Sequence, residues 1–119
     1  MAVTVTEEAT DTLSSTGSDT EDTVVEETSA GVFRVYIDLS NLEGVDATIT
    51  IREYLKLASA GAYKLVNTAT YHGVLLEDGG GGEGPMLELP TRDNLYGYKV
   101  TLADSGSSKD FLWLEVEIG

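Results

Sequence analysis

The sequence predicts an all-β protein: an antiparallel β-sandwich, jelly-roll-like or a small barrel, preceded by an extended acidic N-terminal arm. Short segments of alternating polar and apolar residues recur along the chain, turn-forming residues separate them, and no stretch of ten residues has a helical period. The first 28 residues also contain eight acidic residues and no basic one. We therefore divide the chain into an acidic, Thr/Ser-rich arm, residues 1–29, and a β-sandwich domain, residues 30–119.

The arm contains two segments that are typical of short strands. Ala2–Thr6 and Thr23–Thr28 alternate and are rich in β-branched residues, whereas residues 14–22 between them favour turns. Alone, this polar stretch buries too little apolar surface to fold. We expect it to add edge strands to the domain or to reach a neighbouring subunit. Its apolar residues are candidate interface residues: Val3, Val5, Val24 and Val25.

The first half of the domain begins with a strictly alternating strand, residues 32–39. We expect Phe33, Val35, Ile37 and Leu39 to face the core and Tyr36 to face outward. Residues 47–57 follow as a second strand, with Ala47, Ile49 and Ile51 inward and a bulge near Glu53. Small residues at 59–62 indicate a hairpin, and residues 63–74 form the return strand.

The second half opens with a glycine-rich loop, residues 78–84. A short strand at 86–89 and a turn at 92–94 come next. Residues 95–103 predict a strand with Tyr96, Tyr98, Val100 and Leu102 on one face. The last strand, residues 111–118, is expected to point Leu112, Leu114, Val116 and Ile118 inward and Trp113 outward.

Charge limits the possible partners. The chain has 21 acidic and 7 basic residues, a formal net charge of −14. This field repels nucleic-acid phosphates and anionic lipid, so we expect neither nucleic acid nor a membrane as a partner. No apolar run is long enough to span a bilayer. A basic protein partner is favoured.

The residues that carry chemistry are few, and we expect no catalytic residue, cofactor or metal. There is no cysteine, and His72 is the single histidine. The glycine run Gly79–Gly84 lacks the Lys-Ser or Lys-Thr pair of a phosphate-binding loop. Residues 104–110 offer oxygens that could hold calcium weakly, but they lack the ligand pattern of an EF-hand. The sequence therefore predicts a protein that is not an enzyme.

Aromatic residues on strands are the remaining candidates for a contact surface. Tyr36, Tyr96, Tyr98 and Trp113 could form a protein interface or a platform on which sugars stack. They could equally form cross-strand pairs that the arm covers.

Two segments, Thr28–Leu42 and Gly44–Tyr54, resemble a strand-and-turn pattern found in small virion proteins of tailed bacteriophages. The small-residue turn at Ser59–Gly61, the Tyr-His-Gly sequence at 71–73 and the closing strand at 111–118 match the same pattern. The chain departs from it where Val45 separates Gly44 from Asp46.

The resemblance implies a non-enzymatic β-sandwich that decorates or cements the capsid in many copies. Its partners would then be the major capsid or tail protein and further copies of itself, and it would be located in the virion after assembly in the host cytoplasm. Three alternatives stay open: a tail-associated protein, an extracellular filament subunit that donates its N-terminal strand, and a carbohydrate-binding module.

Overall fold

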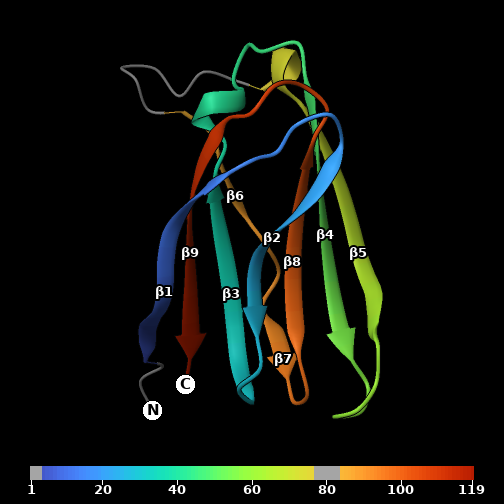
Figure 1. Cartoon of the computed structure of the whole chain (residues 1–119). Coiled ribbons are helices and arrows are strands. Elements are labelled where there is room, and N and C mark those ends of the chain that lie inside the picture. Colours follow the sequence, from blue (N-terminus) through green and yellow to red (C-terminus); the bar gives the residue numbers. More distant parts are fainter. Residues whose placement is uncertain (1–3, 77–83) are drawn as a thin grey trace.

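The computed structural model describes residues 4–76 and 84–119, which form two antiparallel sheets packed face to face (Figure 1). The strands are β1 (Val5–Ser14), β2 (Thr20–Glu27), β3 (Gly31–Asp38), β4 (Thr48–Lys56), β5 (Tyr63–His72), β6 (Met86–Glu88), β7 (Arg92–Asn94), β8 (Tyr98–Asp104) and β9 (Asp110–Ile118). Sheet A has the order β1-β9-β3-β6, with β7 also pairing with β3, and sheet B has the order β2-β8-β4-β5. The predicted all-β sandwich is confirmed. Two short 3₁₀ helices, η1 (Ser40–Leu42) and η2 (Gly73–Leu75), lie in the connections.

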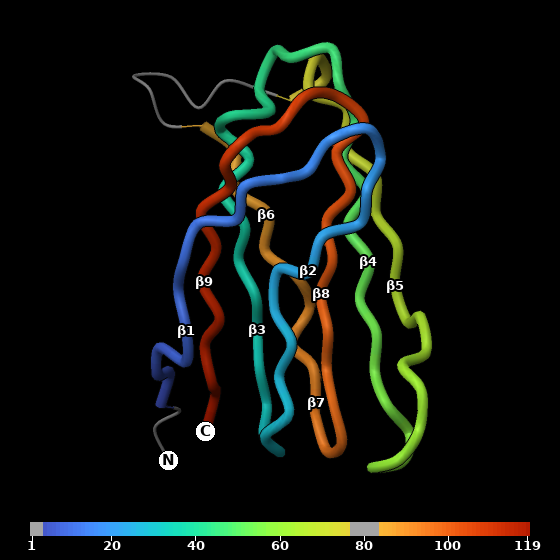
Figure 2. Tube along the Cα trace, in the orientation of Figure 1, coloured from blue at the N-terminus to red at the C-terminus, as the bar shows by residue number. Residues whose placement is uncertain are grey.

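Of the two expectations for the N-terminal segment, the addition of edge strands is observed: β1 and β2, within residues 5–27, are edge strands of sheet A and sheet B, so this part of the chain is not an extended arm. β1 pairs with β9 along its whole length, and β2 pairs with β8. The trace in Figure 2 crosses from one sheet to the other between these strands. Gly17 makes this crossing possible: its φ is +87°, and a Cβ there would lie 2.6 Å from the Gly106 carbonyl oxygen. The β-branched residues of the segment thus add strands to their own domain.

The core between the sheets follows the predicted alternation on β3 and β4. Phe33, Val35, Ile37, Ile49 and Ile51 are buried, as expected. The register also shifts at Glu53 as predicted, but the extra residue is Val66 on β5, so β4 keeps its alternation and Glu53 itself points into the core. Residues 92–94, for which the sequence predicts a turn, form strand β7 instead.

The predicted orientation of β9 is wrong at Leu112 and Trp113, whereas Val116, 6% exposed, is buried as expected. Phe111 is 1% exposed and Trp113 packs against the core, whereas Leu112 is 53% exposed. Both alternating sets of this strand begin with large apolar residues, so the pattern alone does not settle its orientation. The observed choice turns Leu112 and Leu114 outward and buries Glu115.

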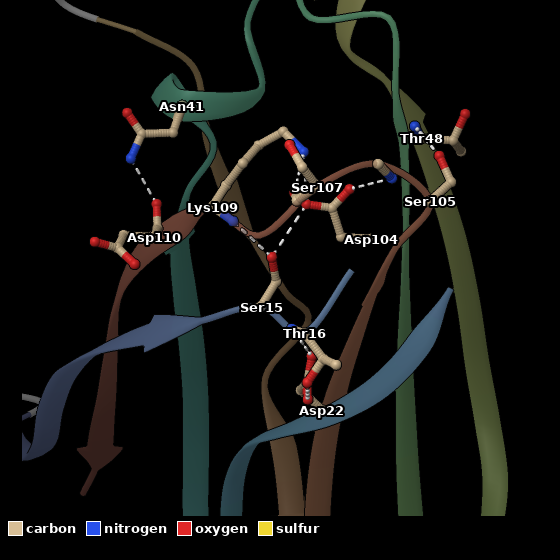
Figure 3. A network of polar contacts seen from close by, with 11 residues as sticks. Ser15, Thr16, Asp22, Asn41, Thr48, Asp104, Ser105, Ser107, Lys109 and Asp110 are labelled. Carbon is tan, nitrogen blue, oxygen red and sulfur yellow. Dashed lines mark hydrogen bonds and ion pairs between the residues drawn. The ribbon is translucent and has the colours of Figure 1, made fainter. Parts of the chain in front are cut away.

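A polar network closes the end of the sandwich where β1 leaves sheet A (Figure 3). Asp104 is fully buried, and its Oδ2 lies 2.8 Å from the Lys109 Nζ. Ser15 Oγ donates to the same Oδ2 over 3.1 Å and accepts the Lys109 backbone N–H over 2.9 Å. The Lys109 ammonium therefore neutralises the buried Asp104 carboxylate within the loop of residues 104–110.

Candidate functional site

A shallow groove with a volume of about 680 Å³ lies on the outer face of sheet A. Its floor is apolar: Leu112 and Leu114 of β9 lie beside Tyr36 of β3 and Met86 of β6. Met86 is 62% exposed and Leu112 is 53% exposed. We call this surface the sheet A groove. The complete lining of described residues is Glu7, Thr10, Tyr36, Asp38, Ser40, Gly84, Met86, Leu112, Trp113 and Leu114.

The polar side chains of the groove are held in place by hydrogen bonds. Asp38 Oδ1 accepts the Ser40 backbone N–H at 2.9 Å and the Ser40 hydroxyl at 2.5 Å. The Tyr36 hydroxyl accepts a hydrogen bond from Arg34 Nη1 at 3.1 Å, and Thr10 Oγ1 donates to the Trp113 carbonyl at 2.8 Å. The two acids of the lining, Glu7 and Asp38, give the groove a negative character. It is an apolar floor with an acidic border, and the lining contains no basic side chain among the residues described.

The structure separates the eight candidate interface residues. Val24, Val25 and Tyr98 are 7%, 5% and 0% exposed and belong to the core, so they cannot contact a partner of the folded chain. Tyr36 lines the sheet A groove as an outward residue, and Trp113, expected outward, packs on the core from the other face of the sheet. 

The other three candidates lie elsewhere. Val5 is 60% exposed at the start of edge strand β1, and Tyr96 is 40% exposed in the turn between β7 and β8. Val3 lies outside the described residues.

Only Tyr36 and Trp113 of the groove lining are among the candidates predicted from sequence, and the apolar residues of its floor that the prediction does not include are Met86, Leu112 and Leu114. The sequence prediction places both leucines in the core together with Val116 and Ile118, as one alternating set of β9. The signal against this placement is the pair Phe111 and Trp113, two large aromatic side chains, but the opposite set holds four aliphatic residues, so the two sets compete. Nothing in the sequence places Met86 beside β3, because that pairing joins residues about 50 positions apart.

A second cluster, of acidic residues, lies between the sheets. Glu53 is fully buried, and its carboxylate accepts hydrogen bonds from Arg92 Nη2 at 2.9 Å, Asn67 Nδ2 at 2.7 Å and the Tyr98 hydroxyl at 2.7 Å. Burial alone would raise the pKa of Glu53, but the hydrogen bonds from Arg92, Asn67 and Tyr98 outweigh it and hold the pKa below its ordinary value. Arg92 comes from sheet A and Glu53 from sheet B, so this ion pair joins the two sheets.

Glu115 and Glu27 form the other part of the cluster. Glu115 is 2% exposed and Glu27 is 7% exposed. Burial, followed by the charge of Glu27 and a hydrogen bond with it, raises the pKa of Glu115 to about 8. Glu115 is therefore protonated at neutral pH. Its Oε2 has no hydrogen-bond partner among the described residues, whereas Glu27 Oε2 accepts the Ser29 backbone N–H at 2.9 Å.

The acid cluster lies in the interior and does not line the sheet A groove. Within residues 4–76 and 84–119, no group of three acidic or histidine side chains is arranged to hold a metal ion. His72 Nε2 lies 3.6 Å from Asp46 at the surface. None of the helices in the described part of the chain could cross a membrane.

Comparison with known proteins gives a fold and no family. No family model matches the chain, and no curated protein matches it. Among solved structures, a crystal structure of PirA is similar, with a TM-score of 0.57 and 13% sequence identity over 92% of this chain and 93% of that one. At this identity the likeness shows that the two chains share a β-sandwich fold along nearly their whole lengths.

Proposed function

We propose that this chain is a non-enzymatic structural protein that works by contact with other proteins, as a component of a tailed-bacteriophage particle that decorates or cements the capsid. The strand pattern at Thr28–Leu42 and Gly44–Tyr54 supports the virion setting. The sheet A groove supports the mode of action. Tail association remains the alternative setting for the same mode of action.

The observation that carries the proposal is the apolar floor of the sheet A groove. Met86 and Leu112 each expose more than half of their surface on a strand face that has an interior core on its other side. Large exposed apolar patches rimmed by polar residues mark protein-contact sites in soluble proteins, and the floor of the sheet A groove would be the apolar centre of such a contact. Glu7 and Asp38 at the border favour a partner with basic residues around an apolar centre.

The interior acids favour a structural role over an enzymatic one. The carboxyls of Glu27 and Glu115 face each other between the sheets, where a substrate would have to separate the sheets to reach them. Glu53 is saturated with donors, including the guanidinium of Arg92. The interactions of these acids link the two sheets, which holds the strands of sheet A in a fixed arrangement and so fixes the shape of its outer face.

A filament subunit that donates its N-terminal strand receives less support. β1 already pairs with β9 from Val5 to Ser14 within the same chain, so this strand is not free to pair with a neighbour.

The test is incorporation into particles. Tagged wild-type chain and a Leu112→Asp variant are supplied to cells that produce the phage encoding the protein, and the particles are purified on a density gradient. Wild-type chain should band with particles, and Leu112→Asp should be lost from them, because the aspartate places a charge on the groove floor. Leu65→Asp is the matched control, since Leu65 is 54% exposed on edge strand β5 and lies outside the groove. Equal incorporation of Leu112→Asp and Leu65→Asp would contradict the proposal.

A carbohydrate-binding role is the second candidate, and Tyr36 favours it. Its ring lies in the groove beside Asp38, Ser40 and Thr10, whose oxygens could bind sugar hydroxyls. Trp113 also borders the groove, but it packs against the core, so Tyr36 is the main aromatic residue of this platform. A glycan array on which wild-type chain gives signals that Tyr36→Ala removes would favour this role, whereas an array without signal would reject it.

A further inference from the structure

The two buried acids Glu27 and Glu115 lie where the end of an edge strand meets a central strand. Glu27 is the last residue of β2, which pairs only with β8. Glu115 lies on β9, which pairs with β1 on one side and with β3 on the other. Figure 1 shows the end of β2 and its connection to β3 at the end of the sheets away from η1. Because β9 is held on both sides, separating the two acids requires the end of β2 to move.

Further acids surround this pair. Glu8, at the register shift of β1, and Glu117, on β9, both disfavour a charge on Glu115, as Glu27 does. Glu117 Oε2 would lie 2.8 Å from a Cβ on Gly31, so its carboxyl borders the first residue of β3. The acids of three strands therefore converge on the connection between β2 and β3.

The other elements near Glu115 do not neutralise this charge. On β3, the residue paired with Glu115 is the fully buried Val35. Tyr98 of β8 donates its hydroxyl to Glu53 of β4 at 2.7 Å. Arg92 of β7 is bound to the same carboxylate, with its Nη2 at 2.9 Å from Glu53 Oε2. The positive charge of Arg92 is therefore already matched by Glu53.

The two carboxyls of the pair differ in their hydrogen bonds. Glu27 Oε2 accepts the Ser29 backbone N–H at 2.9 Å, which favours a charge on Glu27. Glu115 donates a hydrogen bond to Glu27, but its Oε2 has no partner among the described residues. Ionised Glu115 would thus be a buried carboxylate beside a second one, with an oxygen that no donor satisfies. Such a group is unfavourable unless water reaches it.

The end of β2 is built to open apart from the rest of the strand. The pairing of β2 with β8 shifts at Val24, and three residue pairs with β8 follow the shift. Beyond them, Asn94 Nδ2 donates to the carbonyls of Glu27 and Ser29 at 3.2 and 2.7 Å. Residues 25–30 thus form a short unit between the register shift and β3, which we call the latch segment. Local opening of such units is a general property of folded proteins.

We propose that Glu27 and Glu115 form a pH-sensitive latch: the proton that they share keeps the latch segment closed on β9, and loss of this proton lets the segment open. Opening would bring water to both carboxylates and would uncover the end of β8 at Tyr98, which pairs with Glu27. Neither acid of the latch lines the sheet A groove, so the latch does not depend on the proposed function.

The direction of the pH effect follows from proton linkage. Closed Glu115 keeps its proton up to a pKa of about 8, whereas a hydrated carboxyl releases it above its ordinary pKa of 4.5. Closure is therefore strongest below pH 4.5, weakens as the pH rises to about 8, and changes little above that. Within this window the equilibrium constant for opening should rise about tenfold for each pH unit.

The test is amide hydrogen exchange of the full-length chain, resolved by NMR at about pH 5.5 and about pH 7.5 and expressed as protection factors, which remove the pH dependence of intrinsic exchange. In wild type, protection of residues 25–29 should fall about 100-fold between the two pH values. Residues 33–37 of β3 should be better protected at both, because they open only with the whole sandwich. In Glu115→Gln the fall at residues 25–29 should be less than about threefold, because the amide has no proton to lose.

The matched control is Glu26→Gln. Glu26 precedes Glu27 on the same strand, but its side chain is exposed, so this variant should respond to pH as wild type does. Glu27→Gln is a second latch variant, and its response should be smaller than that of wild type, because the charge of Glu27 follows burial among the causes that raise the pKa of Glu115. Thermal melting establishes that each variant is folded.

Four results would overturn the inference. The first is wild-type protection of residues 25–29 that does not change with pH, and the second is a Glu115→Gln variant that responds as wild type does. The third is equal protection of residues 25–29 and residues 33–37, which would mean that the latch segment opens only when the whole protein unfolds. The fourth is a Glu26→Gln variant that loses the response as Glu115→Gln does.

Discussion

Replacing Glu115 by glutamine should stabilise the protein at neutral pH and flatten the dependence of its stability on pH. Glu115 is 2% exposed, and its pKa is raised from 4.5 to about 8. The charged groups around it are Glu27 on β2, Glu8 on β1 and Glu117 on β9, all of which favour the protonated form. The neutral amide keeps the shape of the side chain and can donate to the Glu27 carboxylate.

The magnitude follows from proton linkage. The folded state holds a proton on Glu115 that the unfolded chain releases above pH 4.5, so the stabilisation from this proton is complete below pH 4.5 and is lost as the pH rises to about 8. Each pH unit in this window costs about 1.4 kcal/mol. At pH 7 the free energy of unfolding of the wild-type protein should therefore be about 3 kcal/mol below its value at pH 4.5. The Glu115→Gln variant has no proton to lose at this position and should keep that stabilisation.

The assay is urea unfolding followed by the fluorescence of Trp113, the single tryptophan, which packs on the core. Free energies of unfolding are measured from pH 5 to pH 8 for wild type, Glu115→Gln and Glu88→Gln. Glu88 is the control, because its side chain is 58% exposed on the outer face of sheet A. Glu115→Gln should lack most of the wild-type decline, and Glu88→Gln should retain it. Parallel pH profiles for wild type and Glu115→Gln would refute the reasoning.

Three further outcomes follow from the same structure. Arg92→Met should lower the free energy of unfolding by about 3–5 kcal/mol, because it leaves the buried Glu53 without its cation. Urea unfolding measures this loss. The control is Arg52→Met on the outer face of sheet B, which should lose less than about 0.5 kcal/mol. Deleting residues 1–29 should abolish cooperative thermal unfolding, since β1 and β2 supply an edge strand to each sheet; a truncated chain that melts cooperatively would restore the arm hypothesis. Val25→Ala, measured by the same melts, should destabilise the core by about 1–3 kcal/mol, while Val5→Ala at an exposed position should have little effect.

The sequence was sufficient to predict the fold class and the alternation of the strands that have one apolar and one polar face. β3 is such a strand, and Phe33, Val35 and Ile37 are all buried as predicted. The turn and bulge signals around Glu53 also indicated a real shift in register. These features depend on residues that are close together in the chain.

The groove could not be predicted, because it depends on which face of β9 turns inward. Burying Phe111 and Trp113 also buries Glu115, which is tolerated only because Glu27 on β2 lies opposite and the pair can hold a proton. Glu53 is likewise tolerated because Arg92, 39 residues away, reaches it from the other sheet. The alternation of polar and apolar residues predicts that acidic residues are exposed, because burying an unpaired charge is unfavourable. The partners that make these burials possible come from distant parts of the chain, so they can be identified only from the assembled sheets.

The most direct test of the central claim is hydroxyl-radical footprinting of the chain in purified particles and as the isolated protein. Met86 and Leu112 report on the sheet A groove, and Leu65 and Val66 on β5 report on exposed apolar surface elsewhere. If the groove is the contact surface, oxidation of Met86 and Leu112 should fall strongly in particles while that of Leu65 and Val66 changes little. Unchanged oxidation of Met86 and Leu112 in particles that contain the chain would contradict the claim.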